Sequence, residues 1–150
     1  MGILLRIASF VSMLLLLECS QQYDNMVSVP FDVFSLSETG CVWIELIDPL
    51  DNEVAVINSN AELKNYMICI ENKDAPSIDF SQHSLLLVRG VTPYGTRATI
   101  KNLQYLPNCS YIMNVELAPN LAAVTTNWQI AIITSKLEDD TKIQLHVENE

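Results

Sequence analysis

Apolar and polar residues alternate along much of this chain, which is the period of a β-strand with one buried face. The clearest case shares one face among Cys109, Tyr111, Met113, Val115 and Leu117. The same pattern predicts further strands at 31–36, 41–47, 53–57, 97–106, 128–133 and 143–148. Segment 84–88 is almost continuously apolar, which predicts a central strand covered on both faces.

Turn formers separate these strands. The segment Asp48–Asn52 is rich in them, so the strand 41–47 is expected to return through it into 53–57 as a hairpin. Residues 37–40 predict a turn ahead of this hairpin.

One helix is predicted after the third strand. Ser59 and Glu62 have the spacing of a capping box, in which the serine hydroxyl accepts from the glutamate amide. Apolar residues then recur at helical spacing, at Leu63, Tyr66, Met67 and Ile70. The pattern predicts a helix over about 59–71.

These elements predict an α+β fold: an antiparallel β-sandwich or rolled sheet of about eight strands, with one helix packed over a sheet. Residues 28–150 are expected to form this single β-rich domain, a size that supports a core of its own. Residues 19–27 include the polar stretch Ser20–Asn25 and are expected to act as a tether.

The first 18 residues have the pattern of a secretory signal peptide. One basic residue, Arg6, precedes an uncharged run over 7–17 that ends at Glu18. The run is too short for a membrane-spanning helix, which needs about 20 apolar residues. It is the right length for the apolar core of a signal peptide.

The end of this segment resembles the lipobox of bacterial lipoproteins. Leu16 lies three residues before Cys19, as in that family, whereas Glu18 stands where a small residue is usual. The resemblance implies that Cys19 is lipidated, with acyl chains such as palmitate, and becomes the mature N-terminus. It implies a small cell-envelope lipoprotein held at the outer membrane, on its periplasmic or surface face. A secreted protein is the alternative.

Charge narrows the range of partners. The chain has 18 acidic and 8 basic residues and a net charge of −10. Nucleic acid is not expected as a partner, because its binding depends on clustered Lys and Arg. Attachment to anionic lipid by surface charge is also disfavoured, so the membrane contact would come from the lipid anchor.

The cysteines leave two alternatives open. Beyond Cys19 there are three of them, Cys41, Cys69 and Cys109, none in a C-x-x-C spacing. In the first alternative, all three cysteines are small buried apolar residues. A Cys41–Cys109 disulfide is the other, since an oxidising compartment permits it.

Catalytic patterns are sparse, so no enzyme activity, cofactor or metal site is expected. His146 falls on a polar strand face and His83 at a strand edge. A thiol hydrolase built on Cys109 and a histidine is the least favoured hypothesis. Two acidic clusters are interpreted as solvated turns: Glu138 to Asp140, and Asp48 with Asp51 and Glu53.

Two features suggest binding instead. The loop Gly90–Arg97 combines an aromatic and a basic residue between glycines, and Tyr94 and Arg97 are candidates for partner contact. Trp128 is a candidate platform for a soluble ligand such as a glycan or peptide. An ordinary hairpin and a core tryptophan are the simpler alternatives.

The segment Ser84–Gly90, with its turn to Gly95 and the next strand, loosely resembles the extracytoplasmic domain of bacterial protease-stabilising lipoproteins. That resemblance covers about 60 residues from Phe80 and implies a similar sheet topology and a partner-binding role. The favoured function is therefore a non-catalytic envelope lipoprotein that serves as a protein-interaction or accessory module.

Overall fold

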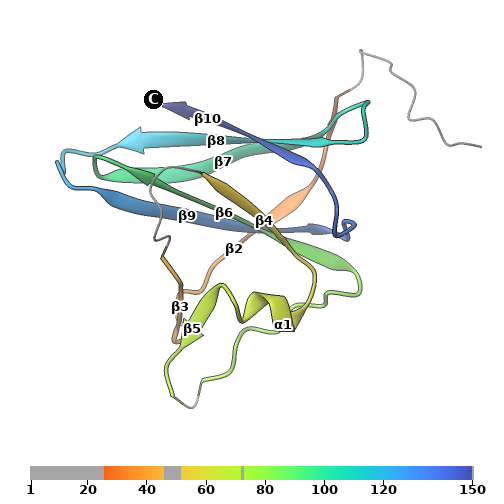
Figure 1. The fold of residues 1–150 in the computed structure, drawn as a ribbon, viewed down its shortest axis with the longest axis horizontal. Coiled ribbons are helices and arrows are strands. Elements are labelled where there is room, and N and C mark those ends of the chain that lie inside the picture. Colours follow the sequence, from red (N-terminus) through yellow and green to blue (C-terminus); the bar gives the residue numbers. More distant parts are fainter. Residues whose placement is uncertain (1–25, 46–51, 72, 150) are drawn as a thin grey trace, which may run out of the picture.

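The computed structural model describes residues 26–45, 52–71 and 73–149. Within them, ten strands and one short helix form two four-stranded sheets and a two-stranded sheet (Figure 1). The predicted β-rich sandwich with one helix is confirmed. The signal peptide, Cys19, most of the tether, and Asp48 with Asp51 lie outside the described residues.

The first large sheet has the order β1 (Val27–Ser28), β7 (Thr96–Tyr105), β8 (Tyr111–Pro119), β10 (Ile143–Asn149). The second has the order β2 (Phe31–Phe34), β9 (Thr126–Ser135), β6 (His83–Thr92), β4 (Glu53–Ile57). Strand β10 runs parallel to β8, and all other pairs are antiparallel. The parallel pair arises because β9, between them in the chain, belongs to the other sheet.

A third layer covers the outer face of the second sheet. It consists of β3 (Cys41–Trp43), α1 (Asn60–Leu63) and β5 (Met67–Cys69), which we call the cap. Figure 1 shows the cap on one side of the large sheets. The molecule therefore has two apolar cores, one between the large sheets and one under the cap.

Strand β6 supplies both cores at once. Leu85 and Leu87 point into the core under the cap, whereas Leu86 and Val88 point into the core between the sheets. All four side chains are fully buried. This confirms the predicted central strand covered on both faces. Burying such a side chain contributes about 1.5–3 kcal/mol each, so β6 contributes strongly to stability.

The predicted helix is wrong over its second half. Helix α1 ends at Leu63, and Met67–Cys69 form strand β5. The start of the helix is as predicted, because the N-cap residue Ser59 accepts through its Oγ from the Glu62 amide at 3.2 Å. Past Leu63 the burial alternates instead, with Met67 buried and Ile68 exposed. Pairing of β5 with β3 outweighs the local helical spacing.

The predicted hairpin between 41–47 and 53–57 is also wrong. Strand β3 pairs with β5, and β4 pairs with β6. The pairing of β4 buries it against the central strand, where Ile57 is fully buried. The turn formers at 48–52 predict a short-range pairing, but burial favours the two longer-range pairs, β3 with β5 and β4 with β6.

The disulfide matches neither of the two alternatives that the sequence left open. Cys41 bonds Cys69, directly opposite on β5, and not Cys109. Cys109 lies exposed in the turn between β7 and β8, with a positive φ of 59°, and not on the core-facing register. It is disulfide-bonded as well, and none of the described cysteines is free.

The described part of the chain contains no helix that is long and apolar enough to span a membrane, because its single helix is short.

Candidate functional site

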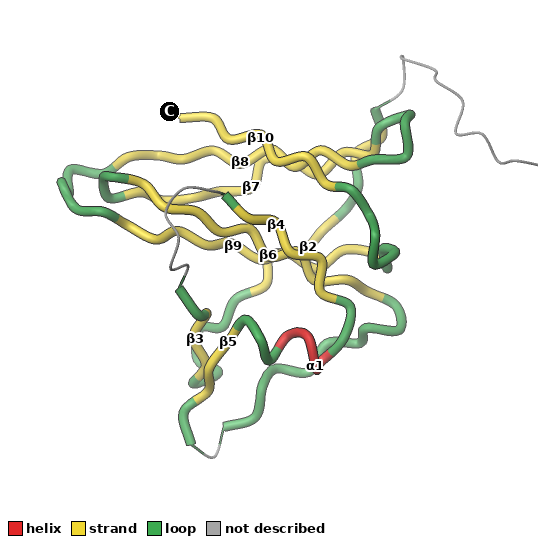
Figure 2. Tube along the Cα trace, viewed as in Figure 1, coloured by secondary structure: helices red, strands yellow, loops and turns green. Residues whose placement is uncertain are grey.

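Two connections form one end of the sandwich. The turn between β6 and β7, Pro93–Gly95, lies beside residues 120–125, which join β8 to β9 (Figure 2, left). The Gly95 amide donates to the Ala122 carbonyl at 2.7 Å, and the Asn120 amide donates to the Gly95 carbonyl at 2.8 Å. We call these two connections the tip. Backbone hydrogen bonds in both directions hold them as one unit.

Gly95 is required for this close approach. A Cβ atom at Gly95 would lie 2.0 Å from Asn120 Oδ1, far inside van der Waals contact. The same Oδ1 accepts from the Ala122 amide at 2.9 Å and shapes the second connection. A side chain at position 95 would therefore displace Asn120 and separate the two parts of the tip.

The tip is apolar and uncharged. Leu121 is fully exposed and Val124 is more than half exposed, and every residue from Pro119 to Thr125 is exposed. Neither 90–96 nor 117–128 contains a charged residue, although the chain carries a net charge of −10. Exposed apolar side chains gathered on a rigid surface are typical of interaction sites.

The two residues singled out from the sequence are placed differently. Tyr94 lies in the tip, half-buried, and its hydroxyl donates to Asn149 Oδ1 at 3.2 Å, which ties the tip to the end of β10. Arg97 lies on β7, exposed, across from Ala118. The sequence prediction missed Leu121 and Val124. Their signal was an apolar run inside a segment of turn formers.

Trp128 is not an exposed platform. It is 4% exposed and packs in the core between the large sheets. The indole covers Gly90, where an added Cβ would lie 2.4 Å from the ring. Trp43 is half-buried and packs edge-on against Phe34, with ring centroids 6.0 Å apart. The ligand-platform hypothesis therefore has no support at Trp128.

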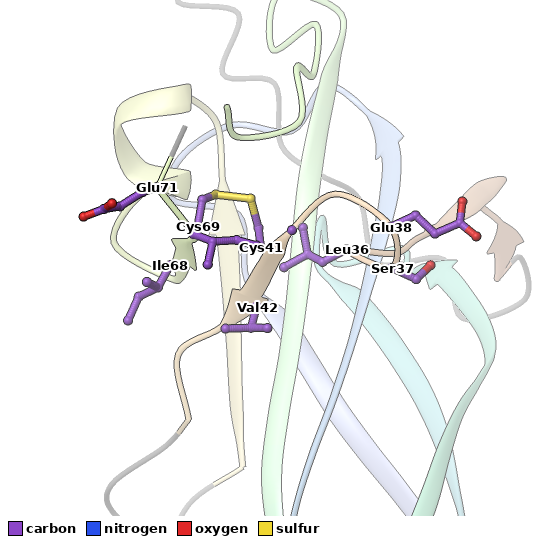
Figure 3. Close-up of a pocket in the computed structure, with 10 residues that line it drawn as sticks. Leu36, Ser37, Glu38, Cys41, Val42, Ile68, Cys69 and Glu71 are labelled. Carbon is purple, nitrogen blue, oxygen red and sulfur yellow. A yellow bond between two sulfur atoms is a disulfide. The ribbon is translucent and has the colours of Figure 1, made fainter. Parts of the chain in front are cut away.

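A second apolar surface lies on the cap (Figure 3). Val42 and Ile68 are opposite each other on β3 and β5 and point outward, and Ile70 follows on the same side. They border an open groove of about 660 Å³ over the Cys41–Cys69 disulfide. We call it the cap groove. The described residues that line it are Leu36, Ser37, Glu38, Gly40, Cys41, Val42, Ile68, Cys69, Ile70 and Glu71.

A buried arginine attaches the cap to the second sheet. Arg89 of β6 is 8% exposed, donates to the Ile44 carbonyl at 3.0 Å, and pairs with Glu53 of β4. Its guanidinium also lies over the Tyr66 ring, 5.1 Å from the centroid. Ile44 and Tyr66 flank the cap strands. The single side chain of Arg89 therefore contacts the segments next to both strands.

The titratable groups of residues 26–45, 52–71 and 73–149 do not assemble into a catalytic set. His83 is exposed at the start of β6, and His146 is exposed on β10, 3.2 Å from Glu148. No group of three metal-ligating side chains occurs among the described residues. Since Cys109 is disulfide-bonded, the thiolate that a hydrolase would use is not present.

In the part of the chain that the structure describes, two pKa values are shifted, in both cases by local contacts. The Ser81 hydroxyl, and then its amide, donate to Asp79 and lower the pKa of that carboxyl. Burial, followed by the neighbouring Tyr105, raises the pKa of Tyr111. Asp79 shapes the turn before β6, and the Tyr105–Tyr111 pair closes the end of β7 and β8, so both shifts reflect folding contacts.

No protein family, curated protein or solved structure matches this chain. The tip and the cap groove each carry large exposed apolar residues: Leu121 and Val124 on the tip, and Val42, Ile68 and Ile70 at the cap groove.

Proposed function

We propose that this protein is a non-catalytic, lipid-anchored module of the bacterial cell envelope that binds a protein partner through the tip. The observation that carries the proposal is the uncharged surface around Leu121 and Val124 on an otherwise acidic chain. Its two connections are hydrogen-bonded to each other, so binding would cost little ordering of the chain.

The direction of the tip supports a partner in the envelope space. The described chain begins at β1, which pairs with β7 at Tyr105, whereas the tip adjoins β7 at Thr96. The strand between these ends spans about 30 Å at 3.3 Å per residue. An anchor near the N-terminus would attach the domain at one end and leave the tip at the other.

The first test replaces the apolar residues of the tip. The double substitution Leu121→Ser and Val124→Ser is expected to reduce co-purification of a cross-linked envelope partner by more than about tenfold. The melting temperature should change little, because both side chains are exposed.

The matched control is Val33→Ser, since Val33 is an equally exposed valine on the edge strand β2. It should leave partner recovery unchanged. Equal recovery with the tip variant and the control would remove the tip from consideration.

The second test concerns the anchor. Mass spectrometry of the mature N-terminus from purified envelopes is expected to find Cys19 first, with a lipid thioether on its sulfur. The chain has four cysteines and Cys41 bonds Cys69, so a lipid thioether on Cys19 and an intramolecular disulfide at Cys109 exclude each other.

A mature terminus upstream of Cys19 would contradict the lipid anchor. So would a tryptic peptide in which Cys19 is joined to another cysteine. Either outcome would leave a secreted domain whose tip remains open to the first test.

A further inference from the structure

The cap groove is a second surface, separate from the tip, so an inference about it goes beyond the proposed function. Strands β3 and β5 are only three residues long and, among the described residues, pair only with each other. Alternation turns Cys41 and Met67 inward, where both are buried, and turns Val42 and Ile68 outward. Val42, Ile68 and Ile70 are 65%, 61% and 65% exposed. Three large apolar side chains thus share one small surface.

This surface is held rigid from below. The Cys41–Cys69 disulfide joins the two strands, and the ladder continues on both sides of it. The Ile44 amide donates to the Tyr66 carbonyl at 2.8 Å, and the Ile70 amide donates to the Gly40 carbonyl at 3.0 Å. Preformed apolar depressions of this kind bind ligands with little loss of conformational entropy.

One wall of the groove is the turn 37–40. Glu38 and Gly40 both have positive φ, of 67° and 76°. The Thr39 hydroxyl donates to the Leu36 carbonyl at 2.6 Å and accepts from the Cys41 amide at 3.1 Å, which fixes the turn. A left-handed backbone at a glutamate costs on the order of 1 kcal/mol, so the turn is held by its surroundings.

Carboxylates stand at both ends of the groove. Figure 3 shows Glu38 at one end and Glu71 at the other, with Leu36, Val42 and Ile68 between them. None of the described lining residues is basic. Lys73 lies nearby and packs its methylene chain toward Gly40, which still leaves the carboxylates in excess. The groove is therefore apolar in the middle and negative at its ends.

We infer that the cap groove binds an extended segment of a partner protein, with apolar side chains on one side and a Lys or Arg at its ends. An extended chain repeats its same-side residues about every 6.6–6.8 Å, so several of its apolar side chains can lie along one such surface. The basic ends would pair with Glu38 and Glu71. An anionic membrane is the poorer occupant, because these carboxylates would face its headgroups.

The test uses defined peptides and the full protein. The probe is a fluorescein-labelled heptapeptide that alternates valine and threonine and has a lysine at each end; its partner probe has glutamates there. Anisotropy is expected to show saturable binding of the lysine peptide, at least about tenfold tighter than the glutamate peptide. Equal binding of the two peptides, or no binding of either, would overturn the inference.

Variants locate the binding. Ile68→Ser is expected to weaken the lysine peptide by about tenfold, and Glu38→Gln with Glu71→Gln to abolish the preference for lysine. Val33→Ser, equally exposed on β2, should change neither value. The tip variant should also bind normally, so failure here and failure of the proposed function are separable.

Two other occupants are outcomes of the same experiment. Sedimentation that reveals a dimer lost in Ile68→Ser would assign a second copy to the groove and overturn the inference. Binding to phosphatidylglycerol vesicles that depends on Ile68 would assign a lipid surface and overturn it as well.

Discussion

At the scale of single residues, two glycines decide close approaches. Gly90 leaves room for the Trp128 ring, and Gly95 leaves room for Asn120 in the tip. The sequence marks both as breaks between apolar runs, but does not say what lies against them. That information comes from residues 25 and 38 positions away in sequence, which only the folded chain brings together.

Gly95→Ala is expected to destabilise the protein by about 1–3 kcal/mol, because the new Cβ would overlap Asn120. Urea denaturation measures the loss. The double variant Gly95→Ala and Asn120→Ala should recover part of it, since the clashing atoms all belong to the Asn120 side chain. Simple additivity of the two single losses would argue against this contact.

At the scale of elements, the cap shows where sequence periodicity misleads. The residues 63–70 fit a helical stripe, and the capping box at Ser59 is real. The chain nevertheless leaves the helix after Leu63, because a second period of two also fits 67–70 and pairs with β3. Short apolar stretches satisfy both periods, so pairing partners decide between them.

Replacing Cys41 and Cys69 with serine is expected to lower the free energy of unfolding by about 3–4 kcal/mol, the chain-entropy value for a loop of this length. The two residues are 28 positions apart in sequence. Thermal unfolding followed by circular dichroism measures the change. A loss well below about 1 kcal/mol would show that the cap holds β3 and β5 without the covalent bond.

At the scale of the whole molecule, the second sheet is covered on both faces. The first sheet packs on one side and the cap on the other, and β6 lies between them with apolar residues on both faces. Arg89 is the buried charged residue of this strand. It spans from the sheet to both cap strands and so couples the third layer to the sandwich.

Arg89→Met is expected to cost about 2 kcal/mol of stability, which urea denaturation would measure. Glu53 is partly exposed and regains water, so the loss is smaller than for a fully buried pair. The exposed Arg97→Ala is the control and should stay within about 0.5 kcal/mol of the wild type. A neutral Arg89→Met would mean that apolar contacts alone hold the cap.

Much of the fold was predictable from the sequence because the buried positions of a strand recur at a regular spacing of apolar residues. The alternation at 111–117 and the uniform run at 85–88 both correspond to observed strands with the expected faces. Partner choice was not predictable in the same way. The hairpin at 41–57 and the Cys41–Cys109 bond failed because each depends on which strand lies alongside, and local residues do not specify that.

Of the two connections that form the tip, only one was predictable from the sequence. The turn 93–95 attracted attention for its aromatic and glycine residues, whereas Leu121 and Val124 looked like an ordinary loop. Only the two backbone hydrogen bonds between these connections make them one surface. Likewise, Ile70 was expected on the apolar stripe of a helix, whereas in the structure it follows β5 and is exposed.

The sequence by itself determined the β-rich class, the central strand and the capping box, because these follow from local period and short-range hydrogen bonding. Tertiary structure decided the strand partners, the disulfide, and the exposure of the tip and cap groove. The physical reason is that exposure depends on what covers a residue, and the covering segments are distant in sequence.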